Sequence, residues 1–200
     1  MDIPIEIQEK FVDYLNGDLK TPEFENWIYT DKNLETLLGE ENYLEIASFN
    51  FRQKGANRAI RNIIEKYIDY SKYETQFILN LVTGIKEKSK SCQSNLKTTY
   101  HLYCSGYAFL DNIGIGYGLK LVVPYEFGAD SWEEIEEQER TRIISGFYPQ
   151  LAEEAEKVIN WIKNGKVKLT GEEGERGRLE YIDKRSVEEK KATSYTRDEK

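Results

Sequence analysis

The stretch from Cys92 to Pro124 constrains the fold most, because it concentrates apolar and aromatic residues in an otherwise polar sequence. Large side chains recur in it at steps of four, three, four and three residues: Leu96, Tyr100, Tyr103, Tyr107 and Leu110. This spacing places all five on one face of an α-helix. Glycines then stand at positions 114, 116 and 118, and helix interiors disfavour glycine. We therefore expect a buried helix that ends near residue 112, a glycine-rich turn, and a short buried extended segment over residues 119–123.

Helical periodicity in most of the remaining chain predicts a mostly α-helical fold. Thr21 and Pro22 are typical of a helix start, and Gly39 is typical of a helix end. Ser131, with a glutamate three residues later, resembles a capping box that opens a further helix. Residues 167–169 and 179–182 alternate instead, with glycines at 171, 174 and 177 between them, and predict a β-hairpin with a long loop. We expect one bundle-like, mainly helical domain over residues 1–185, with a small β-hairpin near the C-terminus and a flexible charged tail over residues 186–200.

Composition limits the kinds of partner that the protein can bind. The formal net charge of −8 and the isoelectric point near 5 argue against general nucleic-acid binding, which needs a basic footprint, and favour a basic partner. The first residues lack the basic start and long apolar run of a signal peptide, and no run is long enough to span a membrane. Cys92 and Cys104, on one helix, would lie about 18 Å apart along its axis and could not form a disulfide. A cytoplasmic protein with free thiols is the simplest interpretation.

Charge is segregated along the chain into three bands. Residues 22–51 carry seven acids and one base, a net of −6. Residues 52–97 carry ten bases and four acids, a net of +6, and residues 126–156 carry ten acids and two bases, a net of −8. The banding is compatible with attraction between neighbouring helices and solvated faces, and also with an acidic surface that captures a basic protein.

No arrangement of residues in the sequence specifies a catalytic site, a cofactor site or a metal site. The single histidine, His101, falls within the expected core helix, and Cys104 one turn later is not at a helix N-terminus, where nucleophilic cysteines are often activated. The glycines at 114, 116 and 118 follow an expected helix and not a strand, so they are not a dinucleotide-binding fingerprint. The glutamates of residues 133–139 are read as a solvated helix face and not as a metal cluster. We expect no enzyme activity, no cofactor and no bound metal.

One segment, residues 24–51, resembles a known family. It matches a pattern that begins FE-x-W-[IV]-Y, continues with an acidic LLGE-type turn, and ends YLE-[IL]-x-S-[FIL]-[ND]-[FY]. The matching residues are Phe24, Glu25, Trp27, Ile28, Tyr29, Leu38, Gly39, Glu40, Tyr43, Leu44, Glu45, Ser48, Phe49 and Phe51. The pattern is similar to that of immunity proteins from polymorphic toxin systems of Bacillus and related Firmicutes, which are encoded beside a secreted nuclease-type toxin.

This resemblance implies a protein that binds and neutralises a cognate, basic toxin. Inhibitors of basic nucleases often place carboxylates where phosphates would lie. On this hypothesis the contact residues are Tyr29, Asp31, Glu35, Glu40, Glu41 and Tyr43, and the acidic helix expected after Ser131 is a second candidate surface. Two alternatives stay open: a phage or host regulatory protein that inhibits a different protein, and a metal-dependent enzyme that uses clustered carboxylates.

Overall fold

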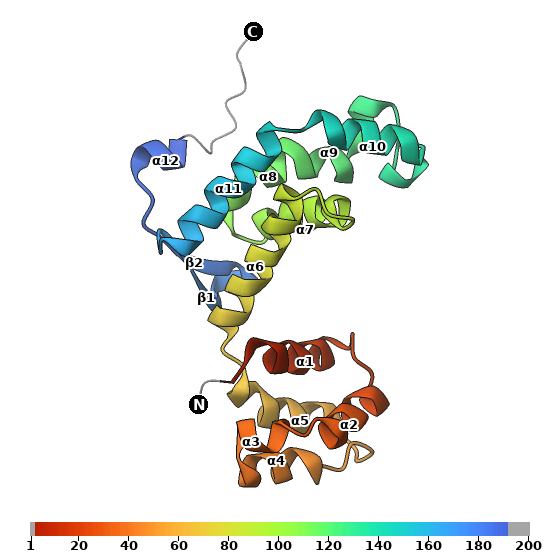
Figure 1. Cartoon of the computed structure of the whole chain (residues 1–200), viewed down its shortest axis with the longest axis vertical. Helices are drawn as coiled ribbons and strands as arrows, with labels where there is room; N and C mark the ends of the chain where they lie inside the picture. Colours follow the sequence, from red (N-terminus) through yellow and green to blue (C-terminus); the bar gives the residue numbers. More distant parts are fainter. Residues whose placement is uncertain (1–2, 192–200) are drawn as a thin grey trace. The chain divides into compact units, whose positions relative to one another are not determined.

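The computed structural model describes residues 3–191 and is shown in Figure 1. The chain is mostly α-helical, with one small antiparallel sheet near its C-terminal end, as the sequence predicts. It divides between residues 73 and 74 into two compact units, each with its own cluster of buried side chains. That the two units behave as one cooperative domain stays a prediction.

The first unit consists of short helices joined by tight turns. They are α1 (Ile5–Asn16), α2 (Thr21–Thr30), α3 (Leu34–Leu38), α4 (Glu40–Ala47) and α5 (Ala56–Ile64), followed by a 3-10 turn at Glu65–Tyr67 and the start of α6 (Tyr70–Lys86). Gly39 has a φ angle of +81° and terminates α3, as the sequence predicts, and Gly17, with a φ of +83°, terminates α1 in the same way.

Aromatic rings fill the core of the first unit. Phe11 and Phe24 are fully buried, and the ring of Tyr14 stacks on that of Phe24 with a centroid distance of 3.9 Å. Trp27 and Phe51 pack on the same cluster at ring distances of 5.6 Å and 5.9 Å from Phe24. These contacts hold α1 and α2 against each other and against the segment after α4.

The second unit contains longer helices and the sheet. Its elements are α6, α7 (Cys92–Cys104), α8 (Asp111–Ile113), α9 (Leu119–Val122), α10 (Glu137–Gly146), α11 (Gln150–Lys163), β1 (Val167–Glu173), β2 (Leu179–Asp183) and α12 (Val187–Lys191). The predicted hairpin is confirmed: β1 and β2 are antiparallel and pair Val167 with Asp183 and Leu169 with Tyr181. Cys92 and Cys104 are both free thiols of α7, as expected.

The prediction of one uninterrupted helix from Leu96 to Asn112 is wrong. Helix α7 ends at Cys104, and Gly106 has a φ of +133°, a conformation that favours glycine. A Cβ at Gly106 would lie only 2.6 Å from the carbonyl oxygen of Leu179, and the Leu179 N–H donates to the carbonyl of Ser105. The helix therefore ends where its backbone meets β2, a long-range contact that helical periodicity does not encode.

The expectations for the glycine-rich turn and for an extended segment at Leu119–Val123 are also wrong. Residues 111–122 are continuously helical, through α8, a π-helical turn at Gly114–Gly118, and α9. Two of the glycines face α7: a Cβ at Gly114 would lie 3.1 Å from Cβ of Tyr103, and one at Gly118 would overlap the carbonyl oxygen of Leu96. Close packing on α7 outweighs the low helix propensity of glycine.

One further segment differs from the sequence prediction, and the expected tail begins with a short helix; its flexibility stays a prediction. The Glu134 carboxylate accepts a hydrogen bond from the Asp130 N–H at 3.1 Å and not from Ser131, so Trp132–Glu134 forms only a 3-10 turn and α10 begins at Glu137. The predicted flexible tail starts with the short helix α12, where Lys166 pairs with Glu189 at 2.5 Å. The rest of that tail, residues 192–200, lies outside the described residues.

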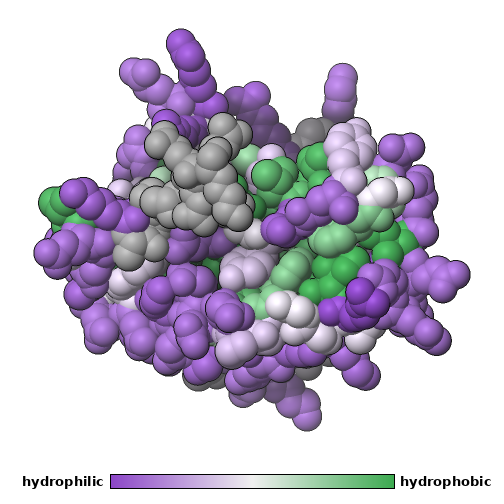
Figure 2. All heavy atoms as spheres, turned by 90° about the horizontal axis from the view of Figure 1, so that it is seen from above, coloured by the Kyte–Doolittle hydropathy of each residue, from purple (hydrophilic) through white to green (hydrophobic). Residues whose placement is uncertain are grey.

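The face in Figure 2 is covered mainly by hydrophilic side chains, with hydrophobic side chains gathered in a limited area. Within residues 3–191, every helix is too short or too polar to cross a bilayer.

Candidate protein-binding surface

The six residues predicted to contact a partner all lie between the end of α2 and the second turn of α4. Tyr29 is in the last turn of α2, Asp31 follows that helix, and Glu35 is in α3. Glu40 and Glu41 form the first turn of α4, and Tyr43 follows them. Helix α4 contacts both α2 and α3 within the first unit, so the structure brings these residues onto neighbouring elements.

Tyr29 and Tyr43 connect α2 and α4 reciprocally. The Tyr29 hydroxyl donates to the carbonyl of Ala47 at 2.9 Å, and the Tyr43 hydroxyl donates to the carbonyl of Ile28 at 3.4 Å. Tyr43 is half-buried and packs on the core, whereas Tyr29 keeps 61% of its surface exposed. Tyr43 therefore has a structural role, and Tyr29 combines an interhelical hydrogen bond with a surface that a partner can reach.

The acidic residues of this region differ in whether they form hydrogen bonds or ion pairs within the protein. Asp31 is half-buried, and its carboxylate accepts the N–H of Asn33 at 2.9 Å. Glu35, Glu40 and Glu41 are exposed, and none of them forms an ion pair within residues 3–191. Their position in the first turns of α3 and α4 is favourable, because the positive end of a helix dipole stabilises carboxylates. These three carboxylates are available to an external cation.

One residue that the site prediction omitted is Leu44. It is 51% exposed, and it shares the solvent face of α4 with Glu40, Glu41, Glu45 and Ser48. In the described part of the first unit, Tyr29 and Leu44 are the two exposed large hydrophobic side chains. The sequence contains a signal for the exposure of Leu44: residues 40, 44 and 48 follow one another at helical i, i+4 spacing, and Glu40 and Ser48 are polar. An apolar residue on such a polar helix face is expected to be exposed to solvent. We call Tyr29, Glu35, Glu40, Glu41 and Leu44 the α2–α4 surface.

In the second acidic band, residues 126–156, bases of the same unit pair with five of the ten acids. Lys120 pairs with Glu126 at 2.9 Å, Lys97 with Glu133 at 2.6 Å, and Lys157 with Glu154 at 2.6 Å. Lys86 pairs with Glu156, and Arg142 lies 3.7 Å from Glu139. Glu134, Glu136 and Glu137 are exposed and form no ion pair within residues 3–191, so the predicted surface after Ser131 also keeps carboxylates that an external cation can reach.

Two other residues with reactive side chains, His101 and Cys104, lie beside Tyr100 on α7. His101 and Cys104 are both exposed on α7, where the His101 ring lies 5.6 Å from that of Tyr100. Within residues 3–191, histidine, cysteine, aspartate and glutamate side chains form no group of three placed to hold a metal ion. The hypothesis of a metal-dependent carboxylate enzyme stays a prediction from the sequence.

Comparison of the chain with family models, curated proteins and solved structures gives no match. The resemblance to immunity proteins thus rests on the residues of the segment 24–51 alone.

Proposed function

We propose that this protein is an inhibitor of the immunity type, which binds a basic, cognate toxin domain through the α2–α4 surface. The proposal needs no enzyme activity and no cofactor in this protein, because binding alone would neutralise the toxin. Partner recognition combines the unpaired carboxylates of Glu35, Glu40 and Glu41 with apolar contact from Tyr29 and Leu44.

The observation that carries the proposal is that exposed apolar side chains on α2 and α4 lie in the same segment as unpaired glutamates on α3 and α4. Tyr29 and Leu44 are 61% and 51% exposed. Both lie in the acidic band of residues 22–51, which contains seven acids and a single base, Lys32. Interface anchors are typically aromatic or aliphatic side chains surrounded by polar ones. The arrangement fits a partner that presents lysine or arginine around an apolar pocket.

The charges would act mainly on the rate of association. Unpaired surface carboxylates steer a cationic protein and raise its association rate at low salt, while the apolar contacts slow dissociation. The α2–α4 surface would therefore give a complex whose formation weakens with ionic strength. A partner bound only through apolar contacts would lack this dependence.

The test is a pull-down of the tagged protein after co-expression with the product of the neighbouring gene in its native host. We expect stoichiometric capture of a basic protein, and loss of capture in the double variant Glu40→Lys, Glu41→Lys. The matched control is Glu136→Lys, Glu137→Lys, which makes the same charge change on exposed residues at the start of α10.

Two outcomes would contradict parts of the proposal. Capture that survives Glu40→Lys, Glu41→Lys but is lost in the control pair would move the interface to α10. Capture of a host enzyme in place of the neighbouring gene product would favour the regulatory-protein alternative.

A further inference from the structure

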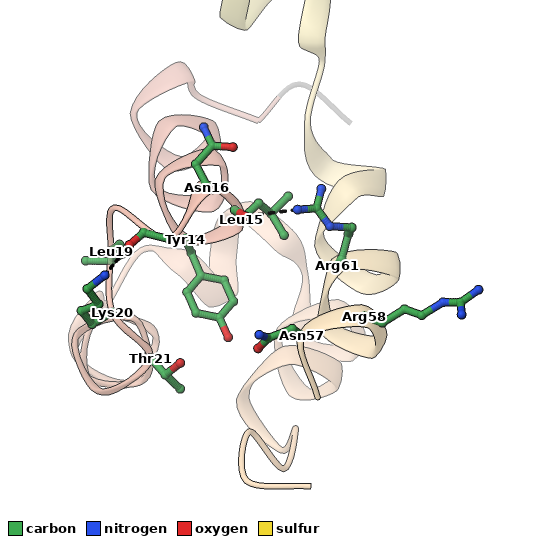
Figure 3. Close-up of a pocket in the computed structure, with 10 residues that line it drawn as sticks. Tyr14, Leu15, Asn16, Leu19, Lys20, Thr21, Asn57, Arg58 and Arg61 are labelled. Carbon is green, nitrogen blue, oxygen red and sulfur yellow. Dashed lines mark hydrogen bonds between the residues drawn. The ribbon is translucent and has the colours of Figure 1, made fainter. Parts of the chain in front are cut away.

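A basic cleft lies within the otherwise acidic first unit, away from the residues of the α2–α4 surface. It has a volume of about 480 Å³ and lies between the end of α1, the start of α2 and the first turns of α5 (Figure 3). Its lining residues are Tyr14, Leu15, Asn16, Gly17, Leu19, Lys20, Thr21, Asn57, Arg58 and Arg61. A cleft of this size is within the range of small-molecule sites.

The charge of the lining is opposite to that of the unit around it. Residues 1–73 contain fourteen acids and nine bases, a net of −5. The lining contains three bases, Lys20, Arg58 and Arg61, and no acid. Arg61 is partly committed, because it pairs with Glu65 at 3.0 Å and donates to the carbonyl of Leu15 at 3.1 Å. The Lys20 backbone N–H donates to the Glu23 carboxylate at 3.0 Å, and the Lys20 ammonium donates to the carbonyl of Gly17 at 2.7 Å. Within the described residues the side chains of Lys20 and Arg58 form no ion pair, so the cleft keeps a positive charge.

The cleft also holds hydrogen-bond donors without acceptors. In the described part of the chain, the backbone N–H groups of Thr21 and Asn57 make no hydrogen bond, and neither do the side chains of these two residues. Thr21 and Asn57 approach the cleft from different helices, on either side of Tyr14 (Figure 3). Donors of this kind, together with lysine and arginine, are the groups that bind phosphate oxygens.

The cleft is lined by buried, well-packed side chains at its base and by exposed side chains at its opening. Tyr14 is buried and fixed by its stacking on Phe24, and Leu15 and Leu19 provide apolar lining. Arg58 extends outward from α5 at the rim and is exposed, so its guanidinium can turn toward an occupant without breaking an internal contact of the described residues (Figure 3).

We propose that this cleft binds a small phosphate-bearing molecule, whose phosphate oxygens accept hydrogen bonds from Thr21 and Asn57 and pair with Lys20 and Arg58. The inference is independent of the proposed toxin binding, since no residue of the α2–α4 surface lines the cleft.

The test is a titration of the ¹⁵N-labelled full chain with inorganic pyrophosphate, ATP and adenosine, followed by amide chemical shifts at constant ionic strength. We expect pyrophosphate and ATP to shift the amides of Gly17, Thr21 and Asn57 at concentrations up to about 1 mM, and adenosine to leave them unchanged. Equal affinity for pyrophosphate and ATP would assign recognition to the phosphates, and tighter binding of ATP would add the remainder of the nucleotide.

Substitutions of the basic residues test whether phosphate binds in this cleft or elsewhere on the protein. Arg58→Gln removes one charge-assisted contact and should weaken binding about tenfold, whereas Lys54→Gln removes an exposed base of the same segment outside the lining and should have no effect. The proposal is overturned if neither phosphate compound shifts these amides, or if Arg58→Gln and Lys20→Gln both bind like the unaltered protein.

Discussion

Gly118 packs directly against the backbone of Leu96, so closely that a Cβ on Gly118 would overlap the Leu96 carbonyl oxygen and lie 3.0 Å from Cβ of Tyr100. We expect Gly118→Ala to lower the free energy of unfolding by about 2–3 kcal/mol, because α7 and residues 111–122 would have to separate. Urea unfolding at neutral pH measures this change.

Gly116 provides the matched control for Gly118. It lies in the same π-helical turn, yet a Cβ built on it would meet no atom within 4 Å. Gly116→Ala should leave stability unchanged or raise it by about 0.5 kcal/mol, because alanine restricts the unfolded chain. Equal destabilisation by the two variants would show that the π-helical backbone itself requires glycine, and would refute the packing explanation.

Contacts such as the one between Gly118 and Leu96 explain which parts of the fold the sequence predicts and which it does not. Periodicity and local residue types identified the helical class, the helix end at Gly39 and the hairpin, because those features depend on neighbouring residues. It failed at Gly106 and at Gly114–Gly118, where the conformation is decided by Leu179, Leu96 and Tyr103, which are distant in sequence or on another helix.

The candidate surface could be predicted only in part for a related reason. Acidic composition pointed to Glu35, Glu40 and Glu41, but the sequence does not show which acids are already paired with bases. Ion pairs such as Lys97–Glu133 in the second acidic band and Lys66–Glu45 in the first depend on the folded chain. The exposure of Leu44 could have been read from the polar face of α4.

Glu74 makes the stability of the second unit depend on pH. Burial raises the pKa of Glu74 above its ordinary value of 4.5, Glu173 raises it further, and the hydrogen bond from Tyr107 opposes the rise. Since the folded-state pKa is the higher one, this group's contribution to stability is fully present below about pH 4.5 and is lost as the pH rises through the folded-state value. Glu74→Gln should therefore stabilise the protein at pH 8 and lose that advantage toward pH 4, as measured by urea unfolding midpoints.

Tyr107→Phe tests the opposing contribution to the same pKa. The Tyr107 hydroxyl donates to the ionised carboxylate of Glu74, so its removal should cost on the order of 1–2 kcal/mol at pH 8 and less at pH 4. A cost independent of pH, or an advantage of Glu74→Gln that grows on acidification, would contradict this account.

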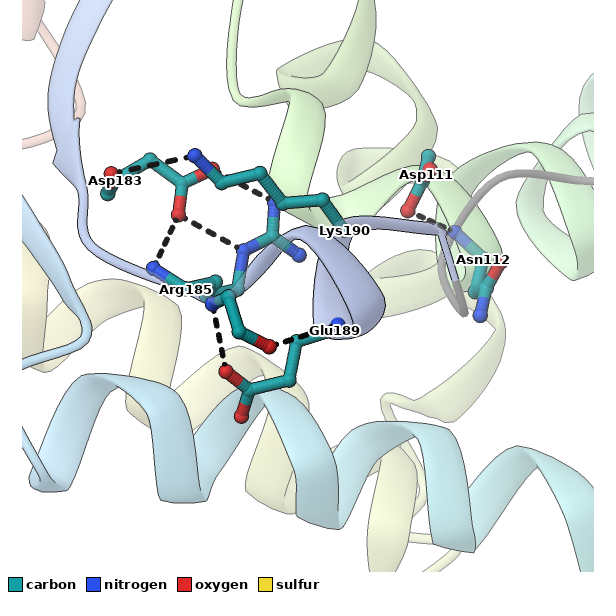
Figure 4. A network of polar contacts seen from close by, with 7 residues as sticks. Asp111, Asn112, Asp183, Arg185, Glu189 and Lys190 are labelled. Atoms are coloured by element: carbon teal, nitrogen blue, oxygen red, sulfur yellow. Dashed lines mark hydrogen bonds and ion pairs between the residues drawn. The ribbon is translucent and has the colours of Figure 1, made fainter.

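Arg185 fixes the end of β2 through a nearly buried ion pair (Figure 4). Its guanidinium donates to both carboxylate oxygens of Asp183, at 3.1 Å and 3.0 Å, and lies 4.6 Å from the ring centre of Trp161. The Arg185 side chain is 4% exposed and that of Asp183 is 18% exposed. We expect Arg185→Met to lower the free energy of unfolding by about 2–3 kcal/mol. The variant removes the guanidinium from the partly buried Asp183 carboxylate, which keeps the longer ion pair with Lys190.

Acidification and a second variant check this interpretation. Burial of Asp183 would raise its pKa, but the hydrogen bonds and charge of Arg185 outweigh burial and lower it below the ordinary 3.8. The stabilisation is thus present above pH 3.8 and is lost as the pH falls through the folded-state value, so the cost of Arg185→Met should shrink there. Lys190→Met, which alters a 44% exposed partner 3.5 Å from Asp183, should cost less than about 0.5 kcal/mol. Equal costs for the two variants would mean that the burial of Arg185 is unimportant.

The α2–α4 surface predicts that Leu44 matters for binding and not for folding. Leu44→Ser changes a side chain that is already 51% exposed, so stability should change by less than about 0.5 kcal/mol. Affinity for the captured basic partner, measured by calorimetry, should fall about tenfold, because an apolar anchor inside an acidic surface excludes water from the surrounding charge pairs.

Tyr29 separates the two roles of this surface, and Val187 provides the control. Tyr29→Phe removes only the hydrogen bond to Ala47 and keeps the ring, so it should bind nearly as well as the unaltered protein, whereas Tyr29→Ala should bind at least tenfold more weakly. Val187→Ser changes a side chain that is 68% exposed in the second unit and should not affect binding. If Leu44→Ser and Val187→Ser bind alike while Glu40→Lys, Glu41→Lys does not bind, recognition is electrostatic only, and the apolar half of the proposed interface is wrong.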